Sequence, residues 1–362
     1  MKVELKTYSV ITGTGSFVPP VIVDNSHFAN NLFMNTDGSI IETPAQEIAE
    51  RFEQITDIKE RRLAEPHHNT SDLATFAAEE ALADAGIDPE MLDYIIVAHN
   101  LGDINPENGY CDIVPTLASR VKYNLGIRNP KAIAYDTTFG CPGWTQAMIQ
   151  ADYYIRSGDA KSALVIGADV LSRAMDPHDR DAMIFSDGAA AVVLEARESE
   201  TPVGMLKHSA RSDALEYLEI LKMGRSFNAS NNRDALYLKM MGRRVYNYGL
   251  TYVPDLVKEC LDKNDLTLTD IKKVLIHQAN AKMDEAILKR LFKLYGMKDV
   301  DMSVMPMIIR TFGNSSAATV PTLCDLVFKG KLSGHVVESG DNVVMTSVGA
   351  GMNINAFVYR MP

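Results

Sequence analysis

One cysteine of the chain stands between two expected elements, where its thiol could act as a nucleophile. An apolar run at residues 131–135 predicts a buried strand, and a helical pattern extends from Trp144 to Arg156. Cys141 lies between them, at the expected start of the helix. Unpaired amides and the helix dipole favour a thiolate there, so Cys141 is a candidate nucleophile. A lone cysteine is more often a small core residue, and this alternative stays open for Cys141 taken alone.

A second stretch repeats the pattern around this cysteine and has an asparagine at the matching position. Residues 138–141 read Thr-Phe-Gly-Cys, and residues 311–314 read Thr-Phe-Gly-Asn. Two further pairs of stretches match in the same order: 92–100 with 271–280, and 186–194 with 347–355. Such collinear matches indicate an internal duplication, in which Cys141 and Asn314 occupy equivalent helix starts.

One of the eight histidines lies where reacting groups of an α/β sheet gather. His277 directly follows the apolar run at residues 274–276, and ligands of open α/β sheets bind beyond the carboxyl ends of the strands. His277 could instead be a hydrogen-bonded core residue, and Asn314 an ordinary helix N-cap. Cys141, His277 and Asn314 all fall at strand ends or helix starts of the two repeated halves. This shared placement favours the interpretation that they form one chemical site.

Composition limits the class of protein. The chain has 362 residues, 46% of them hydrophobic and 23% charged, which suits two globular domains with their own cores. Its formal net charge of -11 argues against broad nucleic-acid binding. The four cysteines show no metal-ligand spacing, so we expect reduced thiols in a cytoplasmic protein. The sequence as a whole implies no cofactor and no metal. We also expect no signal peptide and no membrane-spanning segment, because no apolar run is long enough.

Strand and helix patterns alternate along most of the chain, which predicts an α/β fold built mainly from parallel βαβ units. The pattern fades into polar residues between 197 and 234, and we therefore divide the chain into halves at 1–200 and 201–362. Helical patterns cover residues 45–62, 71–86 and 115–125, and an apolar strand pattern covers 163–167.

Four short motifs accompany these residues: His-Gln-Ala-Asn at 277–280, Asn-Ser-Ser-Ala-Ala at 314–318, Asp-Pro-His-Asp-Arg at 176–180 and Phe-Ser-Asp-Gly-Ala at 185–189. With them, the chain from residue 11 to its end resembles the β-ketoacyl-acyl carrier protein synthase III family of the thiolase superfamily. The resemblance implies a thiolase-like fold of two duplicated halves in α-β-α-β-α layers. It also implies a homodimer in which the sheets of the N-terminal halves join side by side.

The activity that this resemblance implies is a decarboxylative Claisen condensation in fatty acid biosynthesis. Cys141 would accept the acyl group of a starter thioester, and malonyl-acyl carrier protein would then lose carbon dioxide and attack it. His277 and Asn314 would donate hydrogen bonds to the malonyl thioester oxygen as it becomes enolate-like. The backbone amides of Cys141 and Ala350 would hold the oxyanion formed on the acyl group.

The resemblance leaves the starter carrier open. Family members that use coenzyme A typically hold the adenine between a tryptophan and an arginine, and those two places are taken here by Arg51 and Ile55. The starter could therefore arrive on coenzyme A or on a carrier protein. Further expected contacts are Arg180, Lys282 and Trp144 for the substrate, and Lys282, Lys289 and Arg290 for docking of the carrier.

Three other functions stay open at this point. A secondary-metabolite condensing enzyme of the dialkylresorcinol or polyketide type would use the same residues. A Cys-His thioester hydrolase shares the acyl-cysteine chemistry but forms no carbon–carbon bond. A catalytically silent subunit would have no use for an intact set of Cys141, His277 and Asn314.

Overall fold

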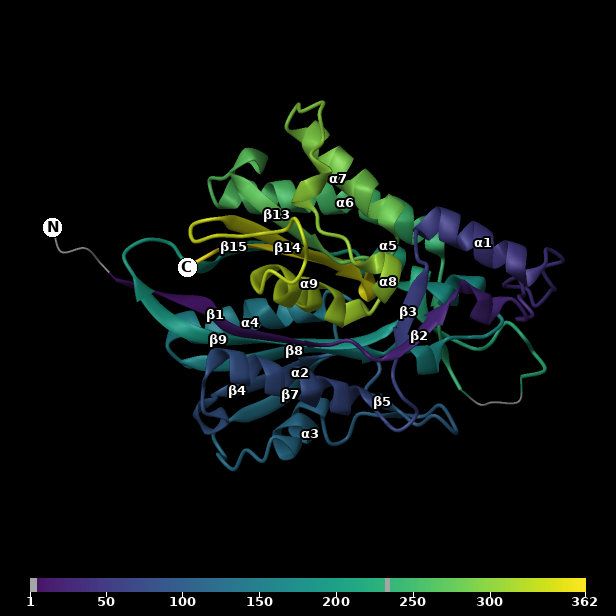
Figure 1. The fold of residues 1–362 in the computed structure, drawn as a ribbon, viewed down its shortest axis with the longest axis horizontal. Helices are drawn as coiled ribbons and strands as arrows, with labels where there is room; N and C mark the ends of the chain where they lie inside the picture. Colours follow the sequence, from purple (N-terminus) through teal and green to yellow (C-terminus); the bar gives the residue numbers. More distant parts are fainter. Residues whose placement is uncertain (1–4, 232–234) are drawn as a thin grey trace.

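The computed structural model describes residues 5–231 and 235–362, in which two mixed sheets alternate with three layers of helices (Figure 1). The first sheet has five strands, in the order β1 (Lys6–Phe17), β9 (Asp187–Ser199), β8 (Ser162–Val170), β4 (Tyr94–Ala98) and β7 (Ile133–Thr137). The second sheet has four, in the order β10 (Gly204–Ser212), β15 (Asn353–Arg360), β14 (Asn342–Gly349) and β13 (Ile271–Ile276).

The two sheets repeat the same pairing. In each, an outer strand pairs antiparallel with a second strand, which pairs antiparallel with a third, and the third pairs parallel with a fourth. The strands of the first sheet lie before residue 200 and those of the second lie after it. The layered, duplicated α/β fold predicted from the sequence is confirmed. The expected predominance of parallel pairing is wrong, because β9 and β15 each run antiparallel to both neighbours.

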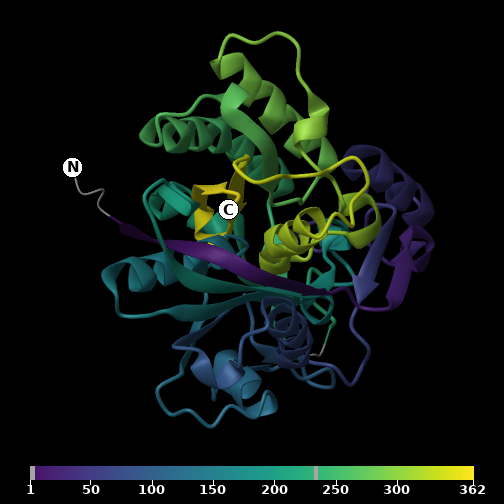
Figure 2. The same cartoon turned by 60° about the vertical axis from the view of Figure 1, so that its left-hand side comes forward.

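Helices fill the three remaining layers. The outer layers hold α2 (Thr70–Ala85) with α3 (Leu117–Asn124), and α6 (Gly242–Lys263) with α7 (Ala281–Leu294), as Figure 1 shows. The central layer between the sheets holds α4 (Gly143–Ser157) and α9 (Thr319–Phe328), and Figure 2 shows α9 lying over β1. At one end of the molecule, α1 (Ala45–Thr56) lies beside the antiparallel pair of β2 (Val21–Asp24) and β3 (Glu60–Leu63).

Short elements complete the described chain. They are β5 (Asp103–Ile104), β6 (Cys111–Asp112), α5 (Ala214–Tyr217), β11 (Leu221–Gly224), β12 (Tyr237–Met240) and α8 (Ile309–Phe312), together with 3-10 turns between them. Among the described residues, no helix combines the length and the apolar character needed to cross a membrane.

Close packing of α2 on the first sheet explains the glycines of β1. A Cβ atom at Gly13 would lie 2.4 Å from the Ala81 carbonyl oxygen, and one at Gly15 would lie 2.5 Å from that of Ala77. Only glycine permits this approach of helix backbone to strand backbone. The Gly-x-Gly pair therefore has a packing role in this fold.

Two local predictions are wrong, and a third segment holds a strand that its sequence pattern does not indicate. The helical pattern expected to reach residue 62 ends at Thr56, because Asp57 adopts a left-handed conformation (φ 60°) and residues 60–63 form β3. The strand expected to be buried, β7, is an edge strand whose Ile133 is 49% exposed. The segment 197–234, in which the pattern fades, contains the sheet strand β10, whose second half is largely exposed and therefore polar. Residues 232–234 of that segment lie outside the described residues.

Candidate active site

Cys141 lies in the turn that connects β7 to α4, as the sequence pattern predicted. Gly140 has a left-handed backbone (φ 69°), and the Gly143 amide donates to the Gly140 carbonyl at 2.9 Å to close the turn. A Cβ atom at Gly140 would lie 2.9 Å from the Ala350 amide nitrogen, so a side chain would displace that loop. The turn holds Cys141 against the segment 349–351.

That segment brings a second backbone amide beside the cysteine. A Cβ atom at Gly349 would lie 2.6 Å from the Cys141 amide nitrogen, which shows how closely the two backbones approach. Ala350 begins the 3-10 turn of residues 350–352, and its carbonyl accepts from the Asn353 side chain at 2.9 Å. The amides of Cys141 and Ala350 thus come from two segments that touch through glycines.

His277 follows β13 directly and is fixed by its backbone. Its amide donates to the Thr346 carbonyl of β14 at 3.0 Å, which extends the parallel pairing of the two strands by one residue. The side chain is 2% exposed, and its Nδ1 atom has no hydrogen-bond partner among the described residues. A buried polar nitrogen without a partner is unusual and is expected where a ligand group completes the site.

Asn314 is held by a bridge between the two halves of the chain. Its amide donates to the Ile184 carbonyl at 3.0 Å, and its carbonyl accepts from the Ser186 amide at 2.9 Å. These bonds form an isolated parallel bridge with Phe185, and α9 begins only at Thr319 after a 3-10 turn. The interpretation of Asn314 as a helix N-cap is therefore wrong.

Ser316 contacts all three candidate catalytic residues. Its hydroxyl donates to the Cys141 Sγ atom at 3.2 Å, and its amide donates to the Asn314 Oδ1 atom at 2.8 Å. A hydrogen bond also joins the Ser316 backbone to the His277 imidazole. Cys141, His277 and Asn314, which are far apart in the sequence, are thus brought around one serine.

Burial controls the protonation of this group. It raises the pKa of the Cys141 thiol to about 12, while the hydrogen bond from Ser316 lowers that pKa and the Asp169 charge raises it further. Burial therefore opposes the thiolate that the helix N-terminus is expected to favour. Burial also lowers the pKa of His277 to about 4, so the imidazole is neutral near pH 7 and carries one N–H donor.

A cavity of about 840 Å³ has Ala279 and Asn280, just after His277, on its wall, but Cys141, His277 and Asn314 do not line it. Apolar side chains from α1, β12 and α7 line much of it. Its wall includes Arg180, an expected substrate contact, and Arg51, which takes one of the two adenine places. Arg243 and Arg244, at the start of α6, line it as well, and sequence reasoning missed both of them. Adjacent arginines at a helix start could have indicated an anion site.

Trp144 does not lie on this cavity. The residue is fully buried between the sheets, where its indole N–H donates to the Val165 carbonyl at 3.3 Å and its ring packs near Phe357. Its position beside Cys141 in the sequence suggested a substrate contact, but the first turn of α4 directs the ring into the core. Trp144 therefore anchors the first turn of α4 in the core between the sheets.

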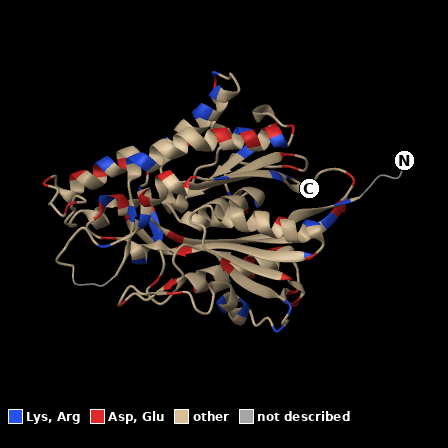
Figure 3. Cartoon of the chain, turned by 180° about the vertical axis from the view of Figure 1, so that it is seen from behind, with Lys and Arg blue, Asp and Glu red and all other residues tan. Residues whose placement is uncertain are grey.

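The residues expected to dock a carrier lie on α7 among acidic neighbours. Lys282 lines a shallow depression with acidic side chains from α1 and with Glu285, and Lys289 lies 3.5 Å from Glu285. Arg290 follows on the same helix. Figure 3 shows basic and acidic positions alternating along the outer helices. The basic surface predicted on α7 is thus interrupted by acidic residues.

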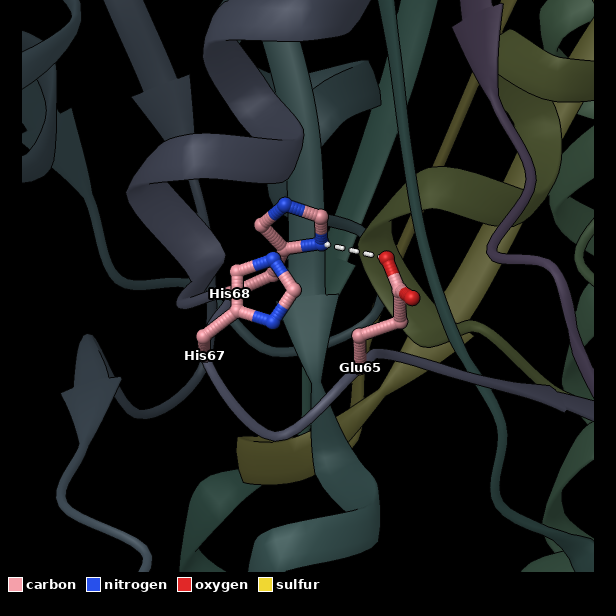
Figure 4. A group of neighbouring side chains, drawn as sticks. All are labelled: Glu65, His67 and His68. Atoms are coloured by element: carbon pink, nitrogen blue, oxygen red, sulfur yellow. Dashed lines mark ion pairs between the residues drawn. The ribbon is translucent and has the colours of Figure 1, made fainter.

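A second group of chemically capable side chains lies in the segment between β3 and α2. His68 Nδ1 lies 3.5 Å from Glu65 Oε2, and the two neighbouring rings of His67 and His68 have centroids 4.0 Å apart (Figure 4). The His68 ring also makes edge contacts with Phe17 and Phe76. These aromatic contacts and the ion pair account for the placement of His68.

Comparisons with known proteins agree on one family. The family model of 3-oxoacyl-(acyl-carrier-protein) synthase III matches residues 135–214, and the model of its C-terminal part matches residues 261–361. The curated β-ketoacyl-(acyl-carrier-protein) synthase III of Rhodospirillum centenum is 33% identical over 356 residues, which cover 97% of this chain and 98% of that relative.

Solved structures give the same result. The 3-oxoacyl-(acyl carrier protein) synthase III of Pseudomonas aeruginosa superposes with a TM-score of 0.79 at 28% identity, and the match covers 98% of each chain. The priming β-ketosynthase of the R1128 polyketide biosynthetic pathway superposes with a TM-score of 0.80 at 25% identity, covering 100% of this chain and 98% of that one.

Proposed function

Because the chain belongs to the β-ketoacyl-acyl carrier protein synthase III family, we propose that Cys141, His277 and Asn314 carry out its condensation. The protein is an acyl-transferring condensing enzyme of fatty acid biosynthesis. The hydrolase and the secondary-metabolite enzyme are not favoured, since curated relatives at 33% identity share the synthase name and the polyketide synthase is more distant at 25%. The convergence of the three side chains on Ser316 is the observation that supports their joint role most directly.

In the first step, we propose that the Cys141 sulfur attacks the carbonyl carbon of an acyl thioester. A new carbon–sulfur bond forms, and the amides of Cys141 and Ala350 hold the oxyanion of the tetrahedral intermediate. Breakage of the original carbon–sulfur bond releases the thiol of the starter carrier and leaves an acyl-cysteine. The close approach of the two glycine-flanked segments supports this use of both amides.

In the second step, the malonyl group on the carrier protein loses carbon dioxide, and its electron pair passes into an enolate. His277 and Asn314 donate to the thioester oxygen where this charge develops. The Asn314 Oδ1 atom already accepts from the Ser316 amide, so its NH₂ group is the end that faces a ligand. The carbanion attacks the acyl-cysteine carbonyl, and the Cys141 sulfur leaves as a thiolate.

A product assay tests this proposal. With an acyl starter and malonyl-carrier protein, the wild-type protein should release carbon dioxide and extend the acyl chain by two carbons on the carrier. Mass spectrometry of the carrier reads the product directly. Free acid from the starter, without a longer chain, would contradict condensation.

For the starter, we propose a phosphate-bearing thioester bound by the arginines of the cavity. Four arginines line it, and guanidinium groups suit phosphates because they donate two hydrogen bonds in a fixed plane: Arg51, Arg180, Arg243 and Arg244. Coenzyme A and the phosphopantetheine arm of a carrier protein both carry phosphate. The adenine end of coenzyme A has little support, because Ile55 is 60% exposed and Arg51 is paired with Glu47.

An acyl group delivered on carrier protein should therefore acylate Cys141 about as fast as the same group on coenzyme A. Loss of an aromatic–adenine stack removes about 1–3 kcal/mol, or roughly 5- to 150-fold in affinity. Quenched-flow acylation, read on the Cys141 peptide, compares the two starters. Arg180→Ala is the matched variant and should slow both, because both carry phosphate. Rapid saturation by acyl-coenzyme A with an inert acyl-carrier would show that other residues bind the adenine.

For carrier docking, we propose the surface of α7 that holds Lys282, Lys289 and Arg290. These residues lie on the helix that follows Asn280, which itself lines the cavity. A carrier bound there would present its arm at the cavity mouth. Lys282 has acidic neighbours, so this surface has no large positive field. We therefore expect carrier binding to depend on individual ion pairs at defined positions.

We also propose a homodimer joined through β7. Among the described strands, β7 pairs only with β4 and forms the free edge of the five-stranded sheet. An unpaired edge with an exposed apolar residue is a template for another strand, and Ile133 of β7 is 49% exposed. Light scattering should give twice the mass of the 39.9 kDa chain. A fully active monomer would reject this assembly.

A cytoplasmic location is our last proposal for function. All four cysteines are free thiols, and Cys111 is exposed. Exposed free thiols persist in reducing compartments, which supports this location.

A further inference from the structure

The hydroxyl of Ser316 lies between the nucleophile and the partly buried side-chain amide of Asn100. It donates to the Cys141 Sγ atom at 3.2 Å and accepts from the Asn100 Nδ2 atom at 2.8 Å. Asn100 is the second residue after β4, whereas Ser316 belongs to the segment that precedes α9. The contact therefore links the nucleophile to both halves of the molecule.

Asp169 fixes the direction of this hydrogen-bond chain. Its carboxylate accepts from the Asn100 amide at 2.8 Å, from the Asn100 Nδ2 atom at 2.7 Å and from the Ala317 amide at 3.2 Å. A carboxylate can only accept, so the Nδ2 group of Asn100 must face it. The same Nδ2 group then donates to Ser316, and the hydroxyl proton is left to point at the sulfur.

The backbone of Ser316 is held in a sparsely populated conformation. Its φ is 52°, which is uncommon for a residue with a side chain and costs free energy unless the surroundings enforce it. Gly167 of β8 permits this arrangement, since a Cβ atom there would lie 2.2 Å from the Ala317 carbonyl oxygen. Because the surrounding segment maintains a strained residue against the nucleophile, the hydroxyl position is specified by the fold.

We propose that Ser316 is a positioning residue whose hydroxyl, oriented by Asn100 and Asp169, stabilises the thiolate of Cys141. A thiolate accepts this hydrogen bond more strongly than a thiol does, so the bond favours ionisation. The inference rests on the proposed role of Cys141 as the nucleophile. It adds a residue that acts through the sulfur without touching the substrate.

The other titratable groups around the sulfur do not favour its ionisation. Asp169 places negative charge near the thiol, and burial acts in the same direction. His99, at the end of β4, bonds to Asp136 at 2.9 Å and accepts from the Gly102 amide at 2.9 Å, so its ring is occupied. His277 is kept neutral by its burial and supplies no compensating cation.

The pH dependence of thiol alkylation tests this role without any substrate. Iodoacetamide reacts with the thiolate, forming a carbon–sulfur bond as iodide leaves, so the rate on the Cys141 peptide follows ionisation. Ser316→Ala should shift the midpoint for Cys141 upward by about one pH unit, or tenfold in thiolate population below it. The exposed Cys111 serves as an internal reference on a separate peptide and should keep its midpoint.

Two variants keep this test decisive. Ser316→Gly suits the left-handed backbone and replaces the alanine variant if that one does not fold. Ser315→Ala removes the neighbouring buried hydroxyl, which contacts Thr319 at 3.3 Å, and should leave the Cys141 midpoint unchanged. An unchanged midpoint in the Ser316 variants, even with slower alkylation at every pH, would overturn the proposal and leave only a structural role. Acylation of a residue other than Cys141 would contradict the proposed function and not the role of Ser316. The two failures can be told apart because alkylation reports on the Cys141 thiol without any substrate.

Discussion

Cys141→Ala should abolish the acyl-enzyme and lower condensation by at least about 10³-fold. Alanine retains the small size that the turn between β7 and α4 accommodates, but it has no sulfur to form the thioester. Intact-protein mass spectrometry after incubation with an acyl thioester measures the effect, because the wild-type mass increases by one acyl group. The variant should show no increase.

The other cysteines supply the controls for this experiment. Cys111→Ala removes an exposed thiol and should leave both acylation and condensation intact. Cys260 and Cys324 are fully buried in the core, where burial raises the pKa of each thiol, so neither is expected to react. Recovery of the acyl group on a peptide without Cys141 would reject Cys141 as the nucleophile.

The positions of the candidate residues could be predicted because they depend on local patterns. Cys141 lies between an apolar run and a helical pattern, and His277 directly follows an apolar run. The sequence pattern therefore predicted where the strand before each of these residues ends. The repeated Thr-Phe-Gly motif then placed Asn314 opposite Cys141. Such patterns record which residues end an element, and the ends of parallel strands meet at one edge of a sheet.

The contacts among these residues could not be predicted, since they join segments far apart in the chain. Ser316 and Asn100 are separated by 216 positions, and nothing in either local pattern indicates their hydrogen bond. The raised pKa of Cys141 escaped prediction for the same reason, because it results mainly from burial among distant segments. The exposed half of β10 lacks an apolar alternation, and its pairing with β15 is what makes it a strand.

Two histidines at equivalent positions of the duplicated halves differ in their hydrogen bonds. His99 follows β4 as His277 follows β13, in matching positions of the two sheets. Both ring nitrogens of His99 are engaged, by Asp136 and by the Gly102 amide. The Nδ1 atom of His277 has no partner among the described residues, so its ring is less fully engaged than that of His99. His99 is therefore engaged within the fold, whereas His277 is the histidine proposed to act on the substrate.

His277→Ala and Asn314→Ala should each retain acylation of Cys141 but lower malonyl decarboxylation by roughly 10²–10³-fold. This is the usual effect of removing one donor to a developing oxyanion. Both side chains are proposed to contact the malonyl oxygen, whereas the oxyanion of the first step is assigned to the amides of Cys141 and Ala350. Burst acylation and carbon dioxide release, measured separately, distinguish the two steps.

His208→Ala is the matched control, because His208 bonds to the Tyr153 hydroxyl at 2.8 Å and has no assigned part in either step. Asn314→Ala also removes the acceptor of the Ser316 amide, so acylation by this variant should decline somewhat, but by less than about an order of magnitude. His277→Ala leaves that bond in place and is the cleaner test of the separation. A variant that fails to acylate Cys141 yet decarboxylates malonyl-carrier at the wild-type rate would reverse the assignment, because the histidine or asparagine would then serve the thiol and not the malonyl oxygen.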